Sequence, residues 1–120
     1  MSESIIKHKS YAFALRIVKA YKYLSSEKKE FVLSKQLLRS GTAIGANVTE
    51  AIGGITKADF SAKISIAYKE ALETEYWLQL LKDAEYLEAN IYDSLIEDCV
   101  ALSKILFSIL KTTGRIRHSD

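Results

Sequence analysis

Residues 38–54 read LRSGTAIGANVTEAIGG, and this stretch decides the fold because it holds four of the chain's five glycines. It could be a phosphate-binding loop, a glycosylated loop, or a helix that needs small residues. A phosphate-binding loop of the GxxxxGK[ST] type would place Lys and then Ser or Thr after the glycines, and no such pair follows Gly45. Asn47 begins the glycosylation tripeptide NVT, but no secretory signal accompanies it. The helix is therefore the best interpretation.

Apolar and small residues in this region recur at alternating steps of four and three, which is typical of one helix face. They are Leu37, Gly41, Ile44, Val48 and Ala51. Each glycine inside a helix costs roughly 1 kcal/mol relative to alanine, so packing must compensate. We therefore predict that Gly41 and Gly45 lie where a neighbouring helix approaches closely. Gly53 and Gly54 are predicted to end the helix in a left-handed conformation.

The rest of the chain repeats this helical pattern, and it contains no proline. We predict one domain over residues 1–120, with helices at about 4–24, 28–52, 57–84 and 91–113 and a polar C-terminal tail. The predicted N-caps are Ser25 or Ser26 for the second helix, Thr56 with Asp59 for the third, and Asn90 for the fourth. Short connections make consecutive helices antiparallel. The predicted fold is an all-α, antiparallel, up-down-up-down four-helix bundle.

The termini and the single cysteine indicate a cellular location. Basic residues interrupt the apolar positions of the N-terminal segment, which argues against a signal peptide, and no apolar run approaches the roughly 20 residues of a membrane span. Cys99 lies in an apolar stretch, as expected for a buried thiol in a reducing compartment. We expect a soluble, cytoplasmic protein without a membrane partner.

The polar residues of the second and third helices allow a structural or a catalytic interpretation. Asn47, Glu50 and Glu73 are predicted to form a buried polar network, joined by Arg39 or Lys63, that sets the helix register. Paired carboxylates could instead serve acid–base or metal chemistry. However, the two histidines lie near the chain ends, so the Glu-x-x-His motif of di-metal bundles is absent. We expect no catalytic residues, no metal and no cofactor.

Charge and apolar patterning suggest two interaction surfaces. Residues 1–39 carry nine Lys and Arg against three Glu, whereas residues 40–113 carry six against eleven Asp and Glu. A basic surface of this kind can meet an anionic partner. The candidate nucleic-acid contacts are Lys9, Arg16, Lys19, Lys22, Lys28 and Lys29. The fourth helix has a second apolar row, predicted to contact another protomer, which consists of Ile96, Val100, Phe107 and Leu110.

The two central segments resemble a known family. Residues 43–51 read AIGANVTEA, in which Asn47 and Glu50 match the polar positions of the 23S rRNA intervening-sequence proteins. Ile66, Ala67 and Glu73 stand where that family has an isoleucine–alanine step and a later glutamate. The chain is also similar to the accessory variability proteins of diversity-generating retroelements. The resemblance implies a four-helix bundle and a ring-shaped homo-oligomer, with a pentamer as the specific expectation.

Two hypotheses about function follow. The first is a non-enzymatic, homo-oligomeric scaffold that binds RNA or an RNA-handling protein through the basic first helix. The second is a structural or protein-binding oligomer without a nucleic-acid role. A basic face would favour the first hypothesis, and a mixed or acidic face would favour the second.

Overall fold

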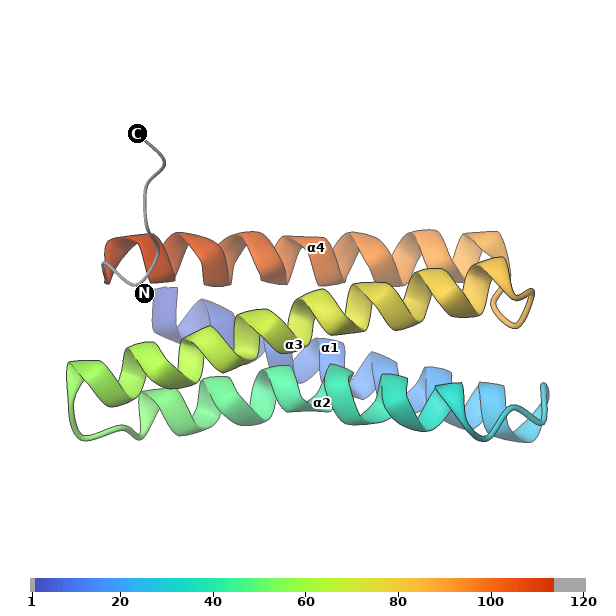
Figure 1. Cartoon of the computed structure of the whole chain (residues 1–120), viewed down its shortest axis with the longest axis horizontal. Helices are drawn as coiled ribbons and strands as arrows, with labels where there is room; N and C mark the ends of the chain where they lie inside the picture. The colour runs from blue at the N-terminus through green and yellow to red at the C-terminus, as the bar shows by residue number, and fades with distance from the viewer. Residues whose placement is uncertain (1, 114–120) are drawn as a thin grey trace.

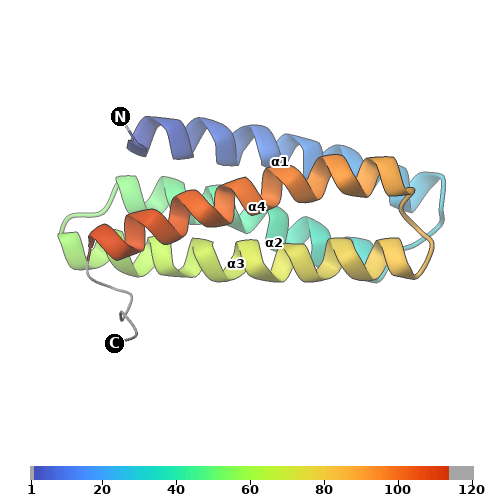
Figure 2. The ribbon, with the colours of Figure 1, turned by 90° about the horizontal axis from the view of Figure 1, so that it is seen from above.

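The computed structural model describes residues 2–113, which form four long helices (Figure 1). These are α1 (Ser2–Ser26), α2 (Leu33–Ile52), α3 (Lys57–Asp83) and α4 (Ala89–Thr112). Each helix runs antiparallel to the one before it, and the elongated bundle is visible from two directions (Figures 1 and 2). α1 contacts α2 and α4, and α3 contacts the same two helices, so α1 and α3 lie on a diagonal. The predicted antiparallel four-helix bundle is confirmed.

Each helix contributes one stripe of side chains to a single core. The stripe predicted for the second helix, including Gly41, is buried throughout. Ile6, Phe13, Ile17, Ala20 and Leu24 of α1 are buried opposite it. The contact between α1 and α4 is the least extensive of the four helix pairs that touch.

Gly41 and Gly45 lie where α2 meets α1. A Cβ atom at position 41 would lie only 2.8 Å from the Cγ1 and Cγ2 atoms of the fully buried Ile17. A Cβ at position 45 would lie 3.3 Å from the carbonyl oxygen of Ser10. Two bulkier residues would therefore hold the helices further apart.

The start of α2 differs from the prediction. α1 continues to Ser26, and the hydroxyls of Ser25 and Ser26 donate to carbonyls of their own helix, 2.9 Å to Tyr21 and 2.6 Å to Lys22. Neither serine caps α2, which begins at Leu33 and not near residue 28. The reason is the turn between the helices, where Lys29 has a positive φ of 55° and the chain reverses direction.

Glu30 caps α2 from outside the helix. Its carboxylate accepts hydrogen bonds from the backbone N–H groups of Val32, Leu33 and Ser34, at 3.1, 2.9 and 2.6 Å. Glu30 is only 7% exposed. Burial alone would raise the pKa of its carboxyl group, but these hydrogen bonds favour the charged form and the net pKa is lowered.

The other helix ends confirm one predicted cap and correct two. Thr56 is the N-cap of α3, and its hydroxyl accepts from the Asp59 N–H at 3.0 Å, as predicted. α4 begins at Ala89 with Glu88 as N-cap, so Asn90 lies inside the helix. Gly53 has a φ of −81°, so the predicted left-handed cap is wrong. Gly114 and the polar tail lie outside the described residues.

Within the part of the chain that the structure describes, none of the helices combines the length and the apolar character needed to cross a bilayer.

Candidate interaction surfaces

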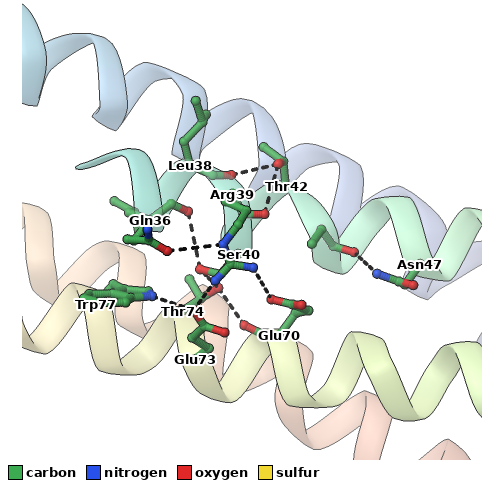
Figure 3. Close-up of polar contacts among 12 residues, drawn as sticks. Gln36, Leu38, Arg39, Ser40, Thr42, Asn47, Glu70, Glu73, Thr74 and Trp77 are labelled. Carbon is green, nitrogen blue, oxygen red and sulfur yellow. Dashed lines mark hydrogen bonds and ion pairs between the residues drawn. The ribbon is translucent and has the colours of Figure 1, made fainter. Parts of the chain in front are cut away.

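A polar seam joins α2 to α3 (Figure 3). The Arg39 guanidinium of α2 lies between two carboxylates of α3, pairing with Glu70 at 3.3 Å and with Glu73. Glu73 also accepts from the indole N–H of Trp77 at 2.9 Å. Because the Arg39 side chain is 48% exposed, these ion pairs contribute little to stability and act mainly on orientation.

Beneath the seam, two buried hydroxyls meet. The Thr74 hydroxyl of α3 lies within hydrogen-bond distance of both the Ser40 hydroxyl of α2, at 2.9 Å, and the Glu70 carbonyl of its own helix, at 2.8 Å (Figure 3). Both residues are fully buried. This pair was not predicted from the sequence, although a serine and a threonine at core positions of adjacent helices were the available signal.

The predicted network of Asn47, Glu50 and Glu73 is not formed within the chain. Asn47 donates to the Ala43 carbonyl of its own helix at 2.9 Å, and the exposed Glu50 pairs with Lys63 at 2.8 Å. Because α2 and α3 are antiparallel, the end of α2 faces the start of α3. Glu73, in the second half of α3, therefore meets Arg39 and lies away from the other two residues.

Two of the six basic candidates on the α1 side are bound by acidic residues near the start of α4. Arg16 pairs with Asp98 at 2.5 Å and donates to the Ser94 hydroxyl at 2.7 Å. Lys28 pairs with Glu88 at 3.1 Å. The other four candidates are Lys9, Lys19, Lys22 and Lys29. They are exposed and make no ion pair within residues 2–113. The resulting face has mixed charge because α4 places its carboxylates beside α1.

Glu88, at the N-cap of α4, contacts residues at the end of α1. Its carboxylate accepts from the Tyr23 hydroxyl at 2.8 Å and binds Lys28, so it joins the α3–α4 loop to the end of α1. The hydrogen bond from Tyr23, with help from Lys28, lowers the pKa of Glu88. The same bond raises the pKa of Tyr23, because the carboxylate favours the protonated phenol.

Large apolar side chains remain exposed on α1 and α3. The exposed ones on α1 are Ile5, Tyr11 and Leu15, and those on α3 are Ile66, Leu72 and Tyr76. Leu72 is 44% exposed and Tyr76 58%. Two more, Phe31 and Val32, lie in the α1–α2 turn, and Ile55 lies in the α2–α3 loop.

Only part of the apolar row predicted on the fourth helix is exposed. Leu110 is 2% exposed and belongs to the core, so it was wrongly placed at an interface. Ile96 and Val100 are half-buried, and Phe107 is 38% exposed. The row lies beside α3, where the ring of Tyr68 is 5.8 Å from that of Phe107. The row therefore extends the apolar surface of α3.

A shallow apolar groove of about 620 Å³ runs between α1 and α2. Its walls are mostly small or aromatic side chains, together with Lys7, His8 and Glu50. The small and aromatic residues are Tyr11, Ala14, Thr42, Gly45, Ala46 and Thr49. The glycine that allows α1 and α2 to approach thus also contributes to the groove.

Residues that could bind a metal ion or act as a nucleophile are spread over the described part of the chain. Residues 2–113 contain no group of three or more His, Cys, Asp or Glu residues placed to hold a metal ion. The Cys99 thiol is buried and donates to the Ala71 carbonyl at 3.4 Å. Burial, reinforced by the charges of Glu75 and Asp98, raises the pKa of this thiol well above its usual range. It is therefore not a thiolate nucleophile at neutral pH.

Comparison with known proteins gives one family. The family model described as 23S rRNA-intervening sequence protein matches residues 2–108. No curated protein matches the chain. A crystal structure of a protein with unknown function from the S23 ribosomal protein family of Bacteroides thetaiotaomicron is 52% identical, with a TM-score of 0.91 over 92% of this chain and 99% of that chain. Neither description indicates an enzymatic activity. The chain belongs to the 23S rRNA-intervening sequence protein family.

Proposed function

We propose that this protein is a non-enzymatic scaffold that assembles with copies of itself through the apolar outer faces of the bundle. One observation carries the proposal, namely that large apolar side chains are exposed on α1 and α3 although the core is already closed by other stripes. Leu72 and Tyr76 stand four residues apart on one face of α3, and an exposed apolar patch of this kind usually marks an interface. A helix with apolar residues on both faces, like α3, is usually covered on both sides.

The two apolar surfaces differ in shape, which supports a ring. The α1–α2 side offers a groove lined by Ala14, Gly45 and Ala46, whereas the α3–α4 side presents Leu72 and Phe107. These sides lie opposite each other in the bundle. A contact between two different surfaces is heterologous, and repetition with a suitable rotation closes a ring. A pentamer is the specific form we propose.

Light scattering coupled to size-exclusion chromatography tests the assembly. Leu72→Glu and Tyr76→Glu are expected to lower the mass of the particle, because each places a charge in the proposed contact. Ala101→Glu is the matched control, since Ala101 is exposed on α4 and lies beside Lys9 and Ala12 of α1, away from Leu72 and Tyr76. It is expected to leave the mass unchanged. A wild-type protein that is monomeric at every concentration would contradict the proposal.

RNA or an RNA-handling protein is a second candidate partner. It is supported by the four exposed lysines on the α1 side that make no ion pair within the described residues, and by the reference to 23S rRNA in the family description. A structured RNA is expected to bind in fluorescence anisotropy, with an affinity that falls steeply with salt. Lys9→Glu with Lys19→Glu should weaken binding, whereas Lys104→Glu on α4 should not. Absence of binding at low salt would leave a protein-binding scaffold.

A further inference from the structure

We propose that the α1–α2 turn, residues 27–32, together with Lys22 of α1 and Lys35 of α2, is a contact site for single-stranded nucleic acid. In this site the ring of Phe31 stacks on a base, and Lys22, Lys29 and Lys35 contact phosphates. The inference rests on the second function proposed above. Phe31 is not among the nucleic-acid contacts predicted from the sequence.

The first support is the way in which the turn holds Phe31 and Val32. These two residues are 52% and 72% exposed, although they follow directly on the buried Glu30. Glu30 donates its N–H to the Leu24 carbonyl at 3.0 Å, and its carboxylate binds three N–H groups at the start of α2. The turn is therefore fixed at both ends of the exposed pair. Apolar groups held outward on a fixed backbone lose little entropy when a partner binds.

The second support is the charge around the exposed pair. Lys22, Lys29 and Lys35 are exposed and make no ion pair within residues 2–113. Lys28 is bound to Glu88, and the one exposed acidic residue within residues 22–35 is Glu27. An exposed aromatic ring in a stretch whose exposed charges are mostly lysines is complementary to a strand that carries both phosphates and bases.

A single strand fits this site better than a duplex or a membrane surface does. In a duplex the bases are stacked on one another, whereas a single strand can place a base on a protein ring. An anionic membrane fits less well, because the α3–α4 loop lies at the same end of the bundle (Figure 1). That loop region exposes Asp83, Glu85 and Glu88, which a flat anionic surface would meet. A narrow strand can contact the α1–α2 side alone.

Fluorescence anisotropy with a labelled single-stranded oligoribonucleotide tests the site, using the full-length protein at two salt concentrations. Phe31→Ala is expected to weaken binding about fivefold or more, and Phe31→Tyr should retain it. Ile55→Ala is the matched control, since Ile55 is 94% exposed in the α2–α3 loop at the other end. It should bind like the wild type. Lys29→Glu with Lys35→Glu should reduce the salt dependence, because fewer counterions are released.

Several outcomes would overturn the inference. One is that Phe31→Ala and Ile55→Ala bind the oligonucleotide with equal affinity. Another is that a duplex of the same length binds as tightly as the single strand. A third is that a poly-glutamate peptide or anionic vesicles bind in a Phe31-dependent way in place of the oligonucleotide. RNA binding that depends on Lys9 and Lys19 but not on Phe31 would keep the second proposed function and reject the turn. An oligomer that binds no RNA would reject both and leave the scaffold intact. Melting curves of the Phe31 variants verify that each protein is folded.

Discussion

The Glu30 carboxylate takes the place of the hydroxyl or amide side chain that caps most helices. Val32, at the N-cap position of α2, has no polar side chain and makes no side-chain cap hydrogen bond. The first N–H groups of a helix need acceptors, and an acidic group near them also complements the helix dipole. Glu30 provides both effects from two residues further back in the chain.

Replacing Glu30 by alanine is expected to lower the free energy of unfolding by about 1–3 kcal/mol, because three N–H groups at the start of α2, that of Ser34 buried and the other two partly buried, lose their acceptor. Urea denaturation followed by circular dichroism at neutral pH measures the change. The exposed Glu27 offers the control, and Glu27→Ala should stay within about 0.5 kcal/mol of the wild type. Equal midpoints for the two variants would show that water replaces the carboxylate without loss.

The same residue predicts an acid dependence. The pKa of Glu30 is lowered in the folded state from its ordinary value of 4.5, so the folded protein holds the ionised form more strongly than the unfolded chain does. Its stabilising contribution is therefore complete above pH 4.5 and is lost as the pH falls through the lower, folded-state pKa. Urea midpoints recorded from neutral pH downward should fall less steeply for Glu30→Gln than for the wild type. Parallel curves would contradict the prediction.

Gly41 is a second residue whose replacement has a predictable sign. Gly41→Ala should improve helix propensity by about 1 kcal/mol, yet the new methyl group would overlap Ile17, and overpacking typically costs about 1–3 kcal/mol. We expect a net loss of stability. A double-mutant cycle with Ile17→Ala checks the cause, because the added cost should shrink when the isoleucine is shortened. If Gly41→Ala costs as much stability in the Ile17→Ala protein as in the wild type, the contact with Ile17 is not the cause.

The helices of this bundle depend on their ends as well as on their faces. α3 has a threonine cap, whereas α2 relies on Glu30 and α4 has no side-chain cap hydrogen bond. The polar residues on the flank of α2 contribute less, since Asn47 satisfies only a carbonyl of its own helix. The contribution of a polar side chain therefore depends on whether it provides an acceptor that the backbone otherwise lacks.

Thr56→Ala and Asn47→Ala are expected to separate these two roles. Loss of the α3 cap should cost about 1 kcal/mol, and Thr56→Ser should recover most of it, because serine is an equally good cap. Asn47→Ala should change the stability by about 0.5 kcal/mol or less, since alanine is the better helix former. Thermal melts of the three variants give the comparison. A large loss for Asn47→Ala would indicate that this residue has a partner in an assembly.

The molecule as a whole combines a closed core with open apolar sides. Its central side chains are fully buried, so opening the core requires separation of the helices. α1 and α3 nevertheless retain exposed apolar residues. This combination is the physical basis of the proposed assembly, because the bundle has already buried one stripe from each helix.

Cys99 provides a measure of global opening. Because its thiol is buried and its pKa is raised, a thiol reagent such as Ellman's reagent should react only with molecules that have opened. The labelling rate is expected to rise with urea in parallel with unfolding. A rapid reaction in native buffer would show instead that the α3–α4 contact opens locally.

Much of the fold could be predicted because the relevant information is local. Apolar residues repeat every three or four positions, and this repetition alone predicts four helices and most of the buried stripes, such as Leu37, Ile44 and Val48. The Thr56 cap was visible for the same reason, since the hydroxyl and the N–H that it binds are three residues apart.

The candidate sites were harder to predict from the sequence because they depend on the placement of one helix beside another. The antiparallel register separates Glu73 from Glu50, and the carboxylates of α4 engage Arg16 and Lys28. Leu110 has the spacing of a surface row but turns toward the core. Periodicity establishes which residues share a helix face, whereas the packing of four helices establishes which faces meet and which remain exposed.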